Sequence, residues 1–145
     1  MEMGVQVESS QIIDRPIDKV FRFMVDDHVR NHPRWDSDIE LWLESDEPIR
    51  LGTIIHRRNS RSGTPVEGTM EVVEFKRNKS FATLIHDGPM KMMGEIHFEP
   101  LGKEQTKVLL ILGLPDMDES TDTSFLERRL QETAAIRKQL IEAET

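Results

Sequence analysis

The sequence contains no cysteine among its 145 residues. Disulfides, zinc sites built on thiolates and cysteine nucleophiles are therefore excluded. No apolar run approaches the ~20 residues that a membrane-spanning helix needs, so we expect no membrane span. The opening residues, MEMGVQVESS, lack a basic segment followed by an apolar one and do not have the pattern of a signal peptide. Together these absences predict a cytoplasmic location.

Positive charge is scarce as well. The chain has 19 Lys and Arg residues against 27 Asp and Glu residues, which gives a formal net charge of −8. A nucleic-acid-binding protein carries a basic patch, and an anionic membrane surface attracts basic segments, so we expect neither partner. Phosphate-binding glycine loops, dinucleotide fingerprints and a Ser-His-Asp order are also missing, and we expect no cofactor. The length suits one domain over residues 1–145, with one core and room for one cavity.

The N-terminal part predicts a strand followed by two short helices. Valines and isoleucines at the ends of residues 5–13 indicate the strand. Pro16 suits the first turn of a helix, where its missing N–H costs nothing. The apolar stripe of this helix consists of Ile17, Val20, Phe21 and Met24. A second helix is expected around residues 28–35, and we expect Pro33 to break it beside His32.

The middle of the chain alternates apolar and polar residues, which is the period of a strand. Six such segments are joined by short turns, and they cover residues 39–45, 53–58, 66–75, 80–86, 90–100 and 106–114. Consecutive strands with short connections predict an antiparallel meander. We therefore expect residues 39–112 to form one antiparallel sheet.

A long amphipathic helix is predicted over residues 119–143. Its apolar side covers about half of the circumference and consists of Phe125, Leu126, Leu130, Thr133, Ala134, Ile136, Leu140 and Ile141. We expect Leu126, Leu130 and Ala134 to face the sheet.

Several motifs in this order resemble the START-like (helix-grip, SRPBCC) superfamily, most of all its polyketide cyclase/dehydrase and lipid-transport branch. They are IIDRPIDKVFRFMVD (12–26), PRWD (33–36), EVVEFKRNKSF (71–81), IHFEPLGKEQTKV (96–108) and the terminal helix. The resemblance implies an α+β helix-grip fold, in which a curved antiparallel sheet (strand, two short helices, six strands) is wrapped around the long C-terminal helix. It also implies a cavity between sheet and helix that binds a hydrophobic small molecule, which can be lipid-like, polyketide-like or aromatic. Only some members are enzymes, so the fold does not decide the chemistry.

Arg137 is the most informative residue for the ligand. It falls near the centre of the apolar side of the terminal helix, where an unpaired guanidinium is costly. It needs either a partner, such as the carboxylate or oxyanion of a ligand, or an exit to water. The candidate ligand-binding residues are Met70, Val72, His86, Met90, Met92, Ile96, Leu126, Leu130, Thr133 and Arg137.

Other interpretations stay open at this point. A cyclase or dehydratase would need an acid or base in the cavity, and His86, His56 and Arg137 are the candidates. His28 and His32 have the spacing of helical metal ligands, but the Glu of a metalloprotease helix is missing, so we expect no metal. A protein-interaction module is a third alternative.

The arginines at 57, 58 and 61 could meet an acidic head group, although a solvated hairpin tip explains them more simply. Trp35 is expected to plug one end of the sheet by packing, with a role as a ligand platform as the alternative. Ligand identity cannot be deduced from the sequence, which also leaves both a monomer and a homodimer open.

The meander also predicts which turns lie together, because alternate turns fall at the same end of the sheet. We expect the turns at 62–65 and 86–89 and the junction at 114–117 to share one end, and the resemblance implies that this end forms the mouth. These segments are rich in Gly, Ser and Pro, which suit loops with special geometries.

Overall fold

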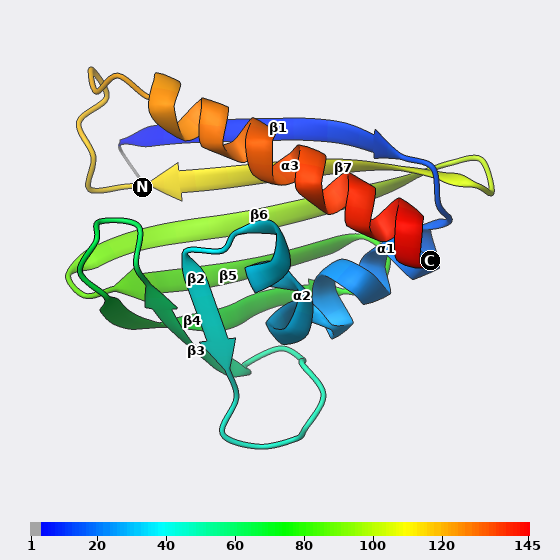
Figure 1. The fold of residues 1–145 in the computed structure, drawn as a ribbon, viewed down its shortest axis with the longest axis horizontal. Coiled ribbons are helices and arrows are strands. Elements are labelled where there is room, and N and C mark those ends of the chain that lie inside the picture. Colours follow the sequence, from blue (N-terminus) through cyan, green and yellow to red (C-terminus); the bar gives the residue numbers. More distant parts are fainter. Residues whose placement is uncertain (1–3) are drawn as a thin grey trace.

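The computed structural model describes residues 4–145, and its seven strands form one antiparallel sheet (Figure 1). In chain order the elements are β1 (Val5–Ile13), α1 (Ile17–Phe21), the π-helical turn η1 (Arg22–Asp26), α2 (His28–Trp35), β2 (Ile39–Trp42), β3 (Ile54–Asn59), β4 (Val66–Lys76), β5 (Ser80–Asp87), β6 (Met90–Leu101), β7 (Gln105–Leu114) and α3 (Ser124–Glu144). The strand order is β1-β7-β6-β5-β4-β3-β2. The predicted α+β architecture and the meander are confirmed; residues 1–3 of the predicted domain lie outside the described part.

A β-bulge in β4 keeps that strand's apolar residues on the core. The pairing with β5 shifts between Val72 and Glu74, so Val73 is the extra residue and lies exposed. Without the bulge the strict alternation would turn Glu74 inward. With it, Phe75 pairs with Phe81 and packs edge-on against its ring, with the centroids 6.3 Å apart.

The π-helical turn η1 buries three consecutive side chains, which an ordinary helix stripe does not do. Phe23, Met24 and Val25 all belong to the core. A π-turn widens the helix and changes which residues face inward. The side chain of Asn31 donates a hydrogen bond of 2.9 Å to the Phe23 carbonyl oxygen, which supports the turn from α2.

Two predictions about prolines need correction. Pro16 precedes α1 as its N-cap, with φ −61° and ψ 152°, rather than lying in the first turn. Pro33 lies inside α2 instead of breaking it beside His32. Its missing N–H leaves only the last turn weakened, and the helix ends two residues later at Trp35. As a result α2 carries His28 and His32 on one continuous helical segment.

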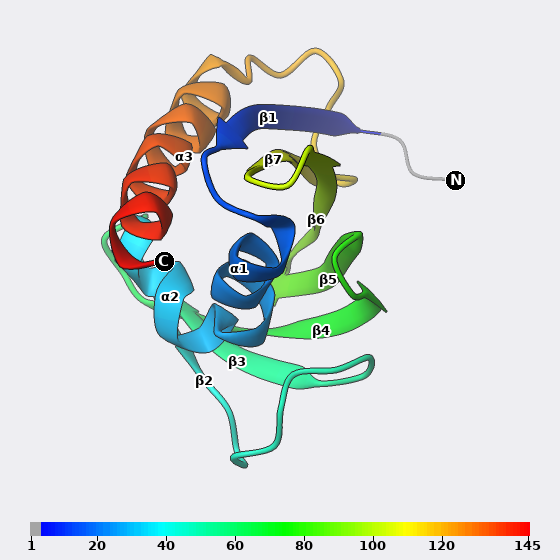
Figure 2. The same cartoon turned by 90° about the vertical axis from the view of Figure 1, so that its right-hand side faces the viewer.

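Helix α3 runs along the open side of the curved sheet, next to β1 (Figure 2). The Gln11 side chain donates to the Ala134 carbonyl oxygen at 2.8 Å, and Lys138 Nζ donates to the Ile12 carbonyl oxygen at 2.6 Å. The helix begins at Ser124 rather than at residue 119, because Asp122 accepts the Ser124 backbone N–H and forms a local turn.

The predicted inner side of α3 is partly correct. Ala134 is buried, while Leu126 and Leu130 are half-buried and pack against the core. Phe125 and Ile136, which the pattern placed on the same side, are exposed. The contact surface is therefore narrower than the apolar arc of the sequence.

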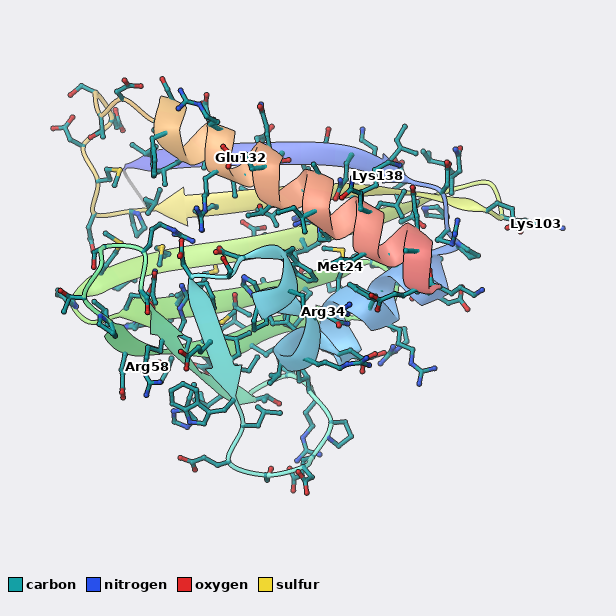
Figure 3. The ribbon with its side chains drawn as sticks, in the orientation of Figure 1. Met24, Arg34, Arg58, Lys103, Glu132 and Lys138 are labelled. Atoms are coloured by element: carbon teal, nitrogen blue, oxygen red, sulfur yellow. The ribbon has the colours of Figure 1, made fainter. Side chains whose placement is uncertain are left out.

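The loops fall at the two ends of the sheet as the meander predicts. The β3–β4 and β5–β6 turns and the connection before α3 lie at the left-hand end in Figure 1. Lys103, in the β6–β7 turn, marks the opposite end in Figure 3.

We predict that Gly68→Ala strongly destabilises the fold. A Cβ at this position in β4 would lie 1.7 Å from the carbonyl oxygen of His86 in β5, and a backbone atom cannot move aside cheaply. Unfolding in urea should show a loss of about 2 kcal/mol or more. Gly113→Ala is the matched control, because its Cβ would meet nothing closer than 3.8 Å. Equal stability of the two variants would contradict the close approach of β4 and β5.

Candidate functional site

A cavity lies between the inner face of the sheet and α3, with α2 closing one end. Its volume is about 140 Å³, close to that of engineered cavities that take up one benzene ring. The apolar wall consists of Ile39, Met70, Phe81, Ile85, Met92, Ile96, Leu110, Leu112, Leu126 and Leu130. The polar lining includes His28, His32, Trp35, Arg57, Arg61, Arg129, Thr133 and Arg137. A mainly apolar hollow with a few polar groups is typical of small-molecule sites.

Arg137 brings a positive charge to the inner side of α3 without a carboxylate partner among residues 4–145. It is 1% exposed, and its Nε and one Nη donate to Gln11 Oε1 at 3.0 and 2.8 Å. The guanidinium carbon also lies 5.6 Å from the centre of the Trp35 ring. Burial lowers the pKa of Arg137 to about 10, and the group therefore remains a cation at neutral pH.

Arg57 is the opposite case, because it is buried with its counter-charge. Its Nε and Nη2 donate to the two oxygens of Asp87 at 2.6 and 2.9 Å, a bidentate pair. Asn59 donates to the same carboxylate at 3.0 Å. The pair joins β3 to β5 and leaves no net charge at this wall.

His28 and His32 form a hydrogen-bonded pair on α2. His28 Nδ1 donates to the Met24 carbonyl oxygen at 2.8 Å, and His28 Nε2 lies 2.9 Å from His32 Nδ1. Burial is the main cause that lowers the pKa of His28 to about 4, and that lowers the pKa of His32 well below 6.5. Both rings are therefore neutral at pH 7. Within residues 4–145 no three acidic, His or Cys side chains are grouped so as to hold a metal ion.

An ion-pair network lies at the edge of the cavity near the start of α3. Arg61 Nη2 bonds Asp36 at 2.7 Å, and Arg129 Nη2 bonds Asp36 at 2.8 Å and also contacts Asp38. Two arginines and two aspartates balance each other here. Glu95 borders the cavity as well, but its carboxylate bonds His97 Nε2 at 3.2 Å on the half-exposed side of β6.

The structure brings most of the candidate ligand-binding residues to this cavity. Those that line it are Met70, Met92, Ile96, Leu126, Leu130, Thr133 and Arg137. Val72 is buried in the core away from the cavity wall. His86 and Met90 are exposed and do not line it. In β5, Phe81, Ile85 and Asp87 are buried, so the alternation turns His86 outward.

His56, the other candidate acid or base, also lies outside the cavity. It stacks on Trp42 and pairs with Glu44 on the outer face of the β2–β3 edge. The hairpin-tip interpretation of the arginines fits Arg61, which lies exposed in the β3–β4 turn and pairs with Asp36. Arg58, labelled in Figure 3, lies half-exposed within β3 and pairs with acidic side chains, while Arg57 is buried. The histidines that do line the cavity are those that the sequence had suggested only as metal ligands. Charged residues at inward-facing strand positions, Arg57 and Asp87, were the signal that could have revealed the buried pair.

The expected mouth is only partly supported. Arg61, just before the 62–65 turn, borders the cavity, whereas no residue of 86–89 or 114–117 does. Leu126 and Arg129 of α3 take their place on this side. Among the described residues, no helix has the length and the apolar composition that crossing a bilayer requires.

Comparison with known proteins supports the fold. No family model and no curated protein matches the sequence. A START superfamily protein from Mycobacterium smegmatis matches with a TM-score of 0.75 at 15% identity, over 98% of this chain and 100% of that one. TTHA0849 from Thermus thermophilus matches with a TM-score of 0.74 at 16% identity, over 97% and 99% of the two chains. DynU16, from the dynemicin biosynthetic locus, matches with a TM-score of 0.69 at 16% identity, over 94% of this chain and 47% of DynU16. The chain has the START-like, helix-grip fold that its motifs predicted.

The same substitution should affect the free energy of unfolding differently at the two buried arginines. Arg57→Met leaves the Asp87 carboxylate buried without its counter-charge, and we expect a loss of about 3–5 kcal/mol in the free energy of unfolding. Arg137→Met removes a buried cation that has no carboxylate partner in the described part of the chain, so we expect unchanged or raised stability. Urea unfolding of both variants measures the difference. A large loss in Arg137→Met would show that the guanidinium is there for stability.

Stability should also fall as the pH falls from about 6.5 to 4. The unfolded chain takes up a proton on His28 near pH 6.5, whereas burial delays this in the folded state to a pKa of about 4. The unfolded state thus binds more protons in this window, and His28 alone accounts for about 3 kcal/mol at pH 4. His28→Gln should flatten the slope of unfolding free energy against pH. The control is His97→Gln, in a half-exposed side chain of β6, and equal slopes in both variants would contradict the assignment.

Proposed function

We propose that the protein binds a small molecule with an apolar body and an acidic group, in the cavity between the sheet and α3. Arg137 would anchor the acidic group. The observation that carries this proposal is a cation that is 1% exposed, lines a cavity and has no carboxylate partner among residues 4–145.

The surroundings of Arg137 fit an anchor better than a structural contact. Gln11 holds two of its nitrogens through one amide oxygen, and the Trp35 ring lies beside it. The remaining Nη1 donates no hydrogen bond within residues 4–145. A donor of this kind is costly to leave unused, and an oxyanion in the cavity would satisfy it with a charge-assisted hydrogen bond.

The size of the cavity narrows the class of ligand. At about 140 Å³ it accommodates one ring or a short chain of similar bulk. An aromatic or short aliphatic acid therefore fits better than a long-chain lipid. The lining supports the same choice, because Met70, Met92 and Phe81 supply adaptable or aromatic contacts around the ring.

A polyketide cyclase or dehydratase is the second candidate. It is favoured by the fold shared with DynU16 of the dynemicin locus. Catalysis would need an acid or base against the substrate, and the exposed His86 and the outward-facing His56 are outside the cavity. His28 and His32 do line it, but burial lowers the pKa of both rings, which makes them weak bases. The binding function therefore ranks first. A pure protein-interaction role ranks last, because it gives no reason for a cation at a cavity wall.

The test compares an acid with a neutral molecule of the same size. Wild type should bind benzoate more tightly than benzyl alcohol, and Arg137→Met should weaken benzoate by about 10- to 100-fold while changing benzyl alcohol by less than about threefold. Titration calorimetry or ligand-observed NMR measures both affinities.

Arg58→Met is the matched control, because Arg58 lies half-exposed on the other face of β3. It should leave both affinities unchanged. Equal losses for the two ligands in Arg137→Met would show that Arg137 only shapes the cavity, and no binding of either ligand to wild type would reject the proposal.

A further inference from the structure

The hydrogen bonds of the His28–His32 pair determine which ring nitrogen carries each proton. The Met24 carbonyl oxygen can only accept, so the proton of the neutral His28 ring lies on Nδ1. Its Nε2 is then an acceptor, and His32 Nδ1 must donate to it across 2.9 Å. Because His32 is neutral as well, its Nε2 carries a lone pair and no proton.

This lone pair receives no hydrogen bond from the described residues. Among residues 4–145, no hydrogen bond is made to His32 Nε2, and the one enclosed polar side-chain atom without a partner is Arg129 Nε. The His32 residue is half-buried. The His32 ring lines the cavity and stacks on Trp35 with centroids 5.4 Å apart, the same ring that Arg137 contacts.

The charges around His32 favour an acceptor over a proton-abstracting base. The groups that face it are His28 on α2, Arg57 on β3, Arg61 after β3 and Arg137 on α3, and each lowers its pKa in addition to burial. A base needs a pKa near the working pH, and this ring has too little affinity for a proton. A neutral acceptor, in contrast, works across the whole range above pH 6.5.

We infer that His32 Nε2 is a fixed hydrogen-bond acceptor of the cavity, held in place by His28 and the Met24 carbonyl group, and that it selects ligands with a hydroxyl or N–H donor. This inference rests on the proposed function, and it adds a second polar group to the ligand. The class of ligand becomes a small hydroxy acid or amino-substituted acid on an apolar body. His32 is thus a specificity residue, and His28 is the positioning residue behind it.

The test uses two neutral probes, so that it does not depend on Arg137. Phenol and anisole share a ring and an oxygen, but only phenol has an O–H. Wild type should bind phenol about fivefold more tightly than anisole. His32→Phe, which keeps a ring against Trp35, should remove this preference, and His97→Phe on the half-exposed side of β6 should keep it.

Nitrogen-15 NMR of the histidine rings gives the second readout. Both His28 and His32 should carry their proton on Nδ1, and the Nε2 signal of His32 should shift when phenol binds but not when anisole binds. His28→Phe should release the His32 tautomer and reduce the preference for phenol.

A proton on His32 Nε2, or an equal affinity for phenol and anisole in wild type, would overturn the inference even if benzoate binds through Arg137. If benzoate, phenol and anisole all fail to bind, both the proposed function and the inference are rejected. A different outcome is that wild type enolises or cyclises a bound substrate in a reaction that His32→Phe abolishes. His32 would then act as a base rather than as an acceptor, and this result would also overturn the inference.

Discussion

A cation held in the interior by neutral groups is the constraint on which the site depends. Arg137 belongs to α3, Gln11 to β1 and Trp35 to α2, so their contacts link the terminal helix, the first strand and the short helical segment. A buried guanidinium with nothing to bond would cost several kcal/mol, which limits how these three elements can be arranged. Gln11 also bonds the Ala134 carbonyl group, so one side chain fixes both the helix and its charge.

The two buried arginines differ in their partners, and this difference separates a structural role from a proposed binding role. Arg57 has all it needs within the chain, because a bidentate carboxylate neutralises and orients it. Arg137 is oriented by Gln11, but this neutral side chain does not balance its positive charge. An arrangement that stabilised only the folded state would have placed an acid beside it or an apolar residue instead of it. A bound anionic ligand would compensate the cost of burying this charge, which supports the proposed binding site beside Arg137.

The fold could be predicted almost entirely from the sequence, whereas the polar part of the site could not. Strand alternation and turns determine the meander, and those signals are local. The π-turn and the bulge at Val73 leave no clear local signal, because each is decided by which residues must reach the core. The outward position of His86 follows from the alternation of buried and exposed residues along β5. The turn at 86–89 had instead suggested that His86 lies at the mouth of the cavity. For His32 the decisive contacts are a second histidine and a cavity wall from distant strands, and no local pattern reveals whether such a pair faces metal, water or a ligand.

The charge of the whole molecule limits which anions could reach Arg137. The network of Arg61 and Arg129 with Asp36 and Asp38 is balanced, and Arg57 is neutralised by Asp87, while the chain as a whole carries −8. At a distance, therefore, the protein repels anions rather than steering them inward. Attraction arises only close to the guanidinium, where water is excluded and the Coulomb interaction is strong. An inorganic anion would lose its hydration without gaining apolar contacts, whereas an organic acid buries its body against the sheet and offsets that loss. In the proposed function, the apolar wall thus selects for the body of the ligand and the buried charge of Arg137 selects for its acidic group.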